Sequence, residues 1–146
     1  FRHPWHRSLN ATLLLRALCK QDFRQLTAYL RARYGMARTG ILHAFRSDAE
    51  QSLIEIPANN CDVSEVANHG THSAPAVSSS ASHLLKFVNR CRQLHTNRLH
   101  VAIAGAMLNK EVWFYPNSYF KNQAVYEFSI QSRFSTVHWV DREAKA

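Results

Sequence analysis

Two short polar segments of the chain carry residue types that suit the binding of an anion. Residues 96–100 read Thr-Asn-Arg-Leu-His and stand between a short apolar stretch and the apolar run 101–108. Arg98 and His100 therefore lie where a strand is expected to end and a helix to begin, and open α/β folds bind anionic ligands at such places. Residues 117–122 read Asn-Ser-Tyr-Phe-Lys-Asn and follow the next expected strand. We expect these two corners of one sheet to face a common pocket.

Arg98 and His100 are the candidates for chemistry at the first corner. An arginine at a helix start presents a planar fork to a carboxylate or phosphate, and the unpaired N–H groups of the first turn add to the attraction. The alternative is an ion pair between Arg98 and Asp48 or Glu50, and the sequence leaves both readings open. His100 is either a hydrogen-bonded structural residue or a proton donor near neutral pH. Both side chains reach one ligand only if Arg98 lies in the turn before the helix.

A second arginine, Arg46, follows the apolar run 41–45 and precedes Asp48 and Glu50. It is either a second anion clamp or part of a salt-bridged loop. At the other corner, the flexible ammonium group of Lys121 suits a phosphate. A lysine at a helix start interacts unfavourably with the helix dipole, so a bound ligand or another interaction is needed to explain its position. The residues beside it that offer hydrogen bonds are Asn117, Ser118 and Asn122.

We expect no metal site in this chain. His3 and His6, and His69 and His72, have the H-x-x-H spacing, but no cysteine stands near them in a zinc-finger spacing. The sequence also contains no glycine-flanked serine nucleophile, paired-carboxylate signature or glycine-rich phosphate loop. Hydrolytic and P-loop chemistry are therefore disfavoured.

The composition indicates one domain with an anionic partner. The chain has 146 residues, is 46% hydrophobic and carries a formal charge of +8, from 18 Lys and Arg against 10 Asp and Glu. This charge favours phosphorylated metabolites, nucleic acid or an anionic membrane surface. The basic residues are scattered, and the groups around residues 31–38 and 86–92 are too sparse for a nucleic-acid tail. The single α/β domain 1–146 is expected to be a piece of a longer protein.

The cysteines and the apolar stretches indicate the compartment. Cys19, Cys61 and Cys91 are odd in number and widely separated, which favours unbridged, buried thiols in a reduced compartment. The sequence shows no signal-peptide pattern and no apolar stretch near the length of a membrane span. We therefore expect a cytoplasmic protein, with peripheral association at the inner face of a membrane as a further expectation.

Helices and strands alternate along the sequence. Asn10 can cap one helix and Asp22 a second, which Gly35 is expected to end. Strands are predicted at residues 41–45, 93–96, 111–115 and 136–140, and helices at 84–88, 99–108 and 124–130. Residues 57–82, rich in Asn, Ser, Ala, Pro and Gly, are predicted to form a long, mobile loop. The alternation predicts an α/β, Rossmann-like domain with a mainly parallel sheet flanked by helices.

The motifs across residues 94–126 resemble the C-terminal signature of the polysaccharide pyruvyltransferase family. Members typically carry T-D-R-L-H, a helix of small and apolar residues, a strand, and then N-S-Y-x-K-N. This chain has T-N-R-L-H at residues 96–100 and N-S-Y-F-K-N at residues 117–122. Residues 46–50, R-S-D-A-E, resemble a second family element, R-x-D-x-E after a strand. Asn97 stands where the family usually has aspartate, so any role of that carboxylate is absent here.

The resemblance implies a fold similar to GT-B glycosyltransferases, of which this chain would supply one half, the C-terminal one. The family transfers the enolpyruvyl group of phosphoenolpyruvate, its donor substrate, to two sugar hydroxyls and forms a pyruvate ketal, with no separate cofactor. By position, Arg46 and Arg98 would hold the donor's carboxylate and phosphate, and Arg98 and His100 would be catalytic, His100 as the acid. The other residues expected to bind substrate are Asn117, Ser118, Lys121 and Asn122.

The partners implied by the resemblance are phosphoenolpyruvate and a nucleotide-linked or lipid-linked sugar used in surface-polysaccharide or glycan synthesis. Two alternatives remain open from the sequence. The first is a GT-B-type glycosyltransferase that uses a nucleotide sugar. The second is a non-catalytic basic domain that binds nucleic acid or acidic glycans, although nucleic acid is the less favoured partner.

Overall fold

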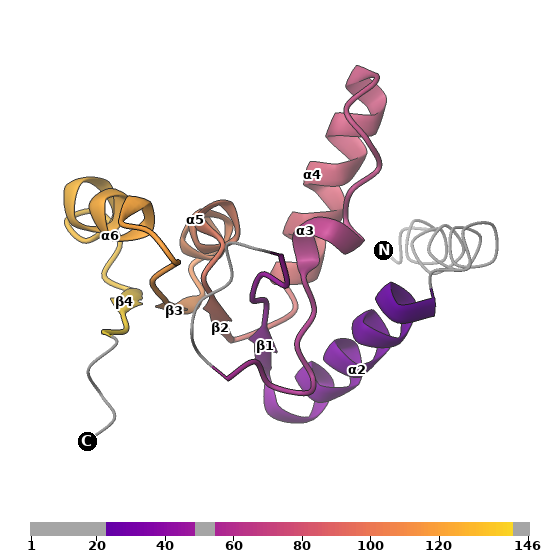
Figure 1. Cartoon of the computed structure of the whole chain (residues 1–146), viewed down its shortest axis with the longest axis horizontal. Helices are drawn as coiled ribbons and strands as arrows, with labels where there is room; N and C mark the ends of the chain where they lie inside the picture. Colours follow the sequence, from indigo (N-terminus) through magenta and orange to yellow (C-terminus); the bar gives the residue numbers. More distant parts are fainter. Residues whose placement is uncertain (1–22, 49–54, 142–146) are drawn as a thin grey trace.

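The computed structural model describes residues 23–48 and 55–141 as four short strands connected by helices (Figure 1). The helix expected after Asn10 and the capping role expected for Asp22 lie outside the described residues. Along the chain the elements are α2 (Phe23–Thr39), β1 (Ile41–His43), α3 (Val63–Val66), α4 (Ala74–Val88), β2 (Gln93–Thr96), α5 (Leu99–Met107), β3 (Glu111–Phe114), α6 (Lys121–Val125), the π-helix η1 (Tyr126–Ile130) and β4 (Val137–Trp139). Within this part of the chain, no helix has both the length and the apolar character that a membrane span requires.

The strands form one parallel sheet in the order β1-β2-β3-β4. The fold is therefore the predicted α/β, Rossmann-like arrangement. Each strand leads through at least one helix to its immediate neighbour, and such crossovers are right-handed. A sheet that grows in one direction through right-handed crossovers carries its connecting helices on one face, and Figure 1 shows α5 and α6 on the same side of the strands. The carboxyl ends of all four strands consequently meet at one edge.

The core lies between the sheet and these helices. Alternate residues of the strands are buried, and the fully buried side chains include Leu42, Leu94, Val112 and Phe114. Helix α5 packs onto this layer through small residues, of which Ala102, Ala104, Gly105 and Ala106 are buried. Small side chains let the helix axis approach the strands closely, which explains the run of alanines in the sequence.

Two of the three cysteines lie in the described residues, and both are free. Cys61 and Cys91 are buried in the core. Burial raises the pKa of the Cys61 thiol to about 12 and that of Cys91 to about 11. Both are therefore protonated, unreactive packing groups at neutral pH, as expected for these two residues.

Helix α2 continues through Gly35 and ends at Thr39, so the predicted end at Gly35 is wrong. Gly40 has a φ of 74°, and its N–H donates to the Met36 carbonyl over 2.8 Å. This left-handed position after the last helical residue is the usual place for a terminating glycine. Gly35 lies inside the helix, where a glycine weakens the helix without stopping it.

The long loop predicted for residues 57–82 is also wrong, because α3 and most of α4 occupy it. Helix α4 begins at Ala74, well before the predicted start at Leu84. Ser73 caps it by accepting a hydrogen bond from the Ala76 N–H, and Pro75 lies in the first turn, where its missing N–H costs nothing. The Ser80 hydroxyl donates to the Ala76 carbonyl, so serine in this helix satisfies its own polar group.

The remaining elements differ from prediction mainly at their ends. Strand β1 stops at His43 rather than residue 45, because the Asn60 side chain accepts a hydrogen bond from the Phe45 N–H over 2.8 Å. Helix α6 begins at Lys121 rather than Ala124 and then widens into the π-helix η1. Strands β3 and β4 are each shorter than predicted, whereas β2 has the predicted bounds.

The other face of the sheet carries a row of rings. The strand register sets His43 beside His95, His95 beside Trp113, and Trp113 beside His138. Neighbouring ring centroids are 5.1, 6.0 and 5.1 Å apart along this row. Burial, and to a smaller extent the charge of His43, lower the pKa of His95 to about 4, and His95 Nδ1 lies 3.0 Å from the Tyr115 hydroxyl. His95 is therefore neutral in the folded protein near pH 7.

We predict that Gly105→Ala destabilises the protein. A Cβ atom at Gly105 would lie 2.7 Å from Leu94 Cδ2 and 2.8 Å from Val112 Cγ2, both in the packed core. Overpacking of this kind costs about 1–3 kcal/mol of unfolding free energy, measurable by urea denaturation. Gly35→Ala is the control, because its Cβ would meet only the Asn59 side chain, 3.1 Å away. Equal stability of Gly105→Ala and the parent would contradict the close approach of α5 to the sheet.

We predict that acid destabilises the protein partly through His95. Its folded-state pKa is lower than that of an unfolded histidine, about 6.5, so the unfolded chain binds the proton first. The unfolding free energy is therefore highest above pH 6.5 and falls as the pH drops toward 4. His95→Phe should flatten this dependence, whereas His72→Phe, at an exposed histidine, should leave it unchanged. Parallel pH profiles for the parent and His95→Phe would disprove the assignment.

Candidate functional site at the carboxyl edge of the sheet

The two sequence corners lie at the carboxyl edge of the sheet, as expected from the parallel topology. Arg46 follows β1, and Arg98 follows β2. Residues 116–120 follow β3 and lead into α6. In open α/β sheets, ligands bind outside the carboxyl ends of the strands. The described chain therefore places its candidate residues where this fold class has its binding sites.

Arg98 is the N-cap of α5 and has an extended backbone, with φ −90° and ψ 115°. It therefore lies in the turn before the helix, which is the condition for Arg98 and His100 to reach one ligand. Thr96 fixes this turn: its hydroxyl donates to the Ala44 carbonyl over 2.7 Å and accepts from the Arg98 N–H over 3.0 Å. The buried threonine thus couples the end of β1 to the start of α5.

The guanidinium group of Arg98 is surrounded by carboxylates. Its Nη2 donates to Asp62 Oδ2 and also lies 3.5 Å from Asp48 Oδ2 and 3.7 Å from Glu65 Oε1. The Asp62 side chain is 8% exposed, whereas those of Asp48 and Glu65 are 44% and 52% exposed. An ion pair with a carboxylate was one of the two sequence expectations, and Asp48 was one of its named partners. The main partner, Asp62, was missed because it lies in the segment predicted to be a loop.

Arg46 binds the same carboxylate that approaches Arg98. Its Nε donates to Asp48 Oδ1 over 2.9 Å and its Nη2 donates to Asp48 Oδ2 over 2.8 Å. This two-pronged geometry is the strong form of an arginine–carboxylate pair. Asp48 therefore joins the two arginines, and we call Arg46, Asp48, Asp62, Glu65 and Arg98 the arginine cluster. Of the two expectations for Arg46, the structure therefore shows the salt-bridged loop.

Two groups of hydrogen-bond donors at this corner have capacity left. Arg98 Nε is buried and has no hydrogen-bond partner in residues 23–48 and 55–141. The N-terminus of α5 receives no side-chain cap from Arg98. Helix N–H groups and a guanidinium N–H are donors that suit an anion. The cluster thus combines arginines paired with carboxylates and one buried arginine N–H without a partner in the described residues.

The structure places the other two cationic candidates at the surface. His100 is the second residue of α5, and Lys121 is the first residue of α6, and both are exposed. In the described part of the chain, neither side chain makes an ion pair or a hydrogen bond with another residue. Lys121 begins α6, three residues before the predicted helix start, and its side chain lies outside the arginine cluster.

Asn97 and Asn122 brace the edge of the sheet. Both are buried, and the Asn122 amide donates to the Asn97 carbonyl over 2.6 Å and to the Tyr115 carbonyl over 3.2 Å. The Asn97 side chain accepts a hydrogen bond from the Arg46 N–H over 2.8 Å. The expected ligand contact through Asn122 is therefore replaced by a structural role. Asn97 likewise shows what an amide does at a position where the resembling family has a carboxylate: it positions the backbone of Arg46.

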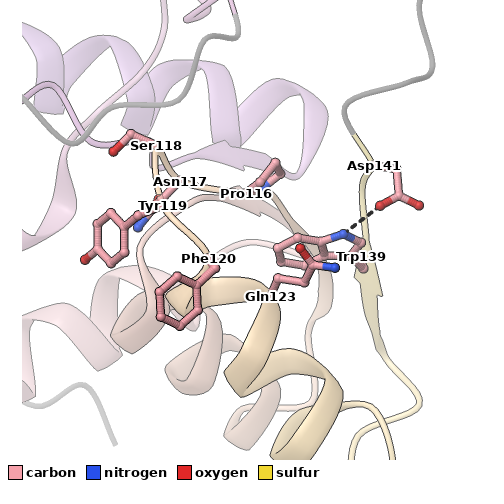
Figure 2. A pocket seen from close by; sticks show the side chains of 8 residues that line it. All are labelled: Pro116, Asn117, Ser118, Tyr119, Phe120, Gln123, Trp139 and Asp141. Atoms are coloured by element: carbon pink, nitrogen blue, oxygen red, sulfur yellow. Dashed lines mark hydrogen bonds between the residues drawn. The ribbon is translucent and has the colours of Figure 1, made fainter.

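A hollow of about 490 Å³ opens beside this brace, at the ends of β3 and β4 (Figure 2). We call it the aromatic hollow. Its apolar lining residues are Pro116, Tyr119, Phe120 and Trp139, and its polar lining residues are Asn117, Ser118, Gln123 and Asp141. Asn117 and Ser118 thus lie in a cavity as expected. Arg46, Arg98, His100 and Lys121 do not line it, so the single common pocket is corrected to two adjacent features: the arginine cluster and the aromatic hollow.

Metal-binding groups do not gather in the described residues: no three His, Cys, Asp or Glu side chains there could hold one ion. His69 contacts His83 of helix α4, the two rings lying 4.4 Å apart. His69 and His72, the H-x-x-H pair, therefore do not form a common set of metal ligands. His3 and His6 lie outside the described residues.

Comparison with known proteins identifies the fold but no function. No family model matches the sequence, and no curated protein matches it. The structure is similar to the crystal structure of a functional uncharacterized protein from Klebsiella pneumoniae, with a TM-score of 0.53 and 30% sequence identity. The match covers 69% of this chain and 36% of the Klebsiella protein, so the chain spans about a third of the length of that relative. The likeness supports the Rossmann-like fold.

We predict that Asn122→Asp loosens this edge of the sheet. The substitution replaces an N–H donor by a carboxylate oxygen that faces two backbone carbonyls, Asn97 O and Tyr115 O. Loss of a buried donor leaves these carbonyls unsatisfied and costs about 1–3 kcal/mol of unfolding free energy. The control is Gln123→Glu, the same chemical change at the next, exposed residue, which faces Glu127 and should cost no more than about 0.5 kcal/mol. Comparable denaturation midpoints for the two variants would rule out the brace.

Proposed function

We propose that this chain is the C-terminal, donor-binding half of a polysaccharide pyruvyltransferase of GT-B type. The observation that carries the proposal is the junction of Arg46 and Arg98 at Asp48, on the carboxyl edge of a parallel sheet. These arginines come from the two sequence elements, R-x-D-x-E and T-N-R-L-H, that resemble the family's motifs. Residues far apart in sequence thus meet in the way a shared donor site requires.

Phosphoenolpyruvate fits the charge pattern of the arginine cluster if it takes the place of carboxylates that now pair with the arginines. The donor carries a carboxylate and a phosphate, and each suits the planar fork of one arginine. Asp48 and Glu65 are exposed enough to turn into water when the donor binds, since neither is held by burial. Asp62 is buried and stays with Arg98, so it keeps that guanidinium in position. The unused Arg98 Nε and the first turn of α5 supply further donors.

The reaction needs a proton at carbon and a leaving phosphate. Protonation of the methylene carbon of phosphoenolpyruvate creates an oxocarbenium-like centre, which one sugar hydroxyl attacks. The phosphate then leaves with its bridging oxygen, and a second hydroxyl of the sugar closes the ketal. One hydroxyl proton balances the proton given to carbon, and the other leaves with the phosphate. In this proposal the arginines stabilise charge on the phosphate, and His100, beside Arg98 at the start of α5, supplies the proton.

The proposed acceptor is a sugar carried by a nucleotide or a lipid, which would place the enzyme in the cytoplasm at the inner face of a membrane. The direct test is to incubate the protein, with and without the remainder of its GT-B fold, with phosphoenolpyruvate and candidate sugars. Phosphate release and a ketal methyl signal by NMR are expected from the complete enzyme. Binding of a UDP-sugar without any response to phosphoenolpyruvate would select the glycosyltransferase instead. Salt-sensitive binding of oligonucleotides would select the basic binding domain.

We predict that Arg98→Lys weakens phosphoenolpyruvate binding while the fold survives. Lysine keeps a positive charge beside the buried Asp62 but loses the planar fork and the Nε donor. A loss of one or two charge-assisted hydrogen bonds lowers affinity by roughly tenfold or more, measurable by calorimetry. Arg98→Ala is unsuitable for this test, because it leaves a buried carboxylate without its partner and unfolds the site.

The matched control for Arg98→Lys is Arg31→Lys on helix α2, an exposed arginine far along the chain from the cluster. Its affinity for phosphoenolpyruvate should equal that of the parent. Thermal denaturation of both variants monitors the fold. An unchanged affinity of a folded Arg98→Lys protein would refute the donor clamp.

A further inference from the structure

The aromatic hollow exposes apolar rings to water. Phe120 is 79% exposed and Tyr119 is 39% exposed, and both precede α6 on the same loop. Figure 2 shows these two rings on one side of the hollow, with Trp139 and Asp141 on the other. Apolar surface left in water costs free energy that a ligand's apolar face would recover. Two walls with rings facing one cavity indicate a ligand that is itself apolar on its faces.

The described polar side chains that line the hollow are neutral or acidic, and contacts within the protein hold the carboxylate and the indole in place. The Trp139 indole N–H donates to Asp141 Oδ1 over 2.8 Å, which fixes the carboxylate at the rim. Tyr126 stacks on Trp139, with ring centroids 5.4 Å apart, so the indole is itself held from behind. Asn117, Ser118 and Gln123 add amide and hydroxyl groups. These groups both donate and accept hydrogen bonds.

A second cavity adjoins the hollow. A neighbouring cavity of about 530 Å³ shares Gln123, Trp139 and Asp141 with it and extends along α6 and η1 to Glu127 and His138. Among residues 23–48 and 55–141, no lysine or arginine lines either cavity, in a chain whose formal charge is +8. The carboxylates of Asp141 and Glu127 disfavour phosphates, nucleic acid and acidic glycans at this surface. A neutral ligand longer than one ring fits this shape and charge.

We propose that the aromatic hollow is the subsite for a neutral saccharide, the acceptor of the proposed transfer. A pyranose has apolar C–H faces that pack on aromatic rings and a rim of hydroxyls that bond to amides and carboxylates. The assignment of this sugar as the acceptor rests on the proposed function, whereas the sugar site itself is argued only from the residues of the hollow. It differs from the expected donor role of Asn117 and Ser118, because the hollow has acidic rather than cationic walls.

The position of the hollow suits an acceptor. The arginine cluster lies at the ends of β1 and β2, and the hollow lies at the ends of β3 and β4. Neighbouring strands are about 4.8 Å apart, so the centres of the two features lie about two strand spacings, roughly 10 Å, apart along the edge. The brace between Asn122 and Asn97 links them directly. A sugar in the hollow would therefore lie at the same edge of the sheet as the arginine cluster.

The test measures sugar binding without the donor. Methyl glucoside, methyl galactoside and methyl mannoside are titrated into the full chain, and saturation-transfer NMR reports contact with aromatic protons. Phe120→Ala should weaken the best glycoside by about three- to tenfold, because one stacking ring is lost. Phe128→Ala is the matched control, since Phe128 is 85% exposed, lies on η1 and does not line either cavity. Its affinity should equal that of the parent.

A charge test separates a ligand contact from a merely structural effect. The parent should bind methyl glucoside more tightly than methyl glucuronide, and Asp141→Asn should narrow that gap because the repelling carboxylate is gone. Glycoside binding that Phe120→Ala and Phe128→Ala affect equally would overturn the site. A protein that binds phosphoenolpyruvate but none of the three glycosides would overturn the sugar assignment alone. A protein that binds glycosides but not phosphoenolpyruvate would overturn the proposed transfer and keep the saccharide site.

Discussion

The hydrogen bonds among Asn97, Asn122 and the backbone of Arg46 hold the carboxyl edge of the sheet together. Parallel strands leave their last carbonyl and N–H groups without ladder partners, and burial makes each unpaired group costly. Asn97 satisfies the chain after β1, and Asn122 satisfies the chain after β2 and β3. Because these bonds join segments from three strands, the arginine cluster and the aromatic hollow keep a fixed relation to each other.

The charges at this edge differ from the charge of the whole chain. A formal charge of +8 favours anionic partners in general. The arginine cluster nevertheless contains three carboxylates beside its two arginines, and the part of the hollow formed by described residues contains Asp141 and no lysine or arginine. Net charge describes long-range attraction, whereas binding depends on the groups within a few ångströms. The local pattern therefore differs between the two features: paired charges in the arginine cluster, and a single carboxylate among the described lining residues of the hollow.

Burial separates the structural carboxylate from the exchangeable ones. Asp62 is enclosed and bonded to Arg98, so removing its partner would leave a charge in a low-dielectric site. Asp48 and Glu65 face water, where an ion pair contributes little net stability. The same arginine thus has one enclosed partner, which fixes its position, and two partners that face water.

The sequence alone determined the alternation of strands and helices, the bounds of β2 and the position of Arg98 at a strand-to-helix corner. These features depend on neighbours a few residues apart, such as the β-branched and aromatic run in β3 and the small residues of α5. The partners of those residues depended on the tertiary structure. Asp62 reaches Arg98, Asn122 reaches Asn97, and Asp141 reaches the hollow only because the sheet brings distant segments to one edge. Helix α4 was hidden for a related reason: serine and alanine carry no strong periodic signal, and its cap and its contacts with α3 and α5 stabilise it. Local pattern therefore decided which elements form, and long-range packing decided which side chains meet.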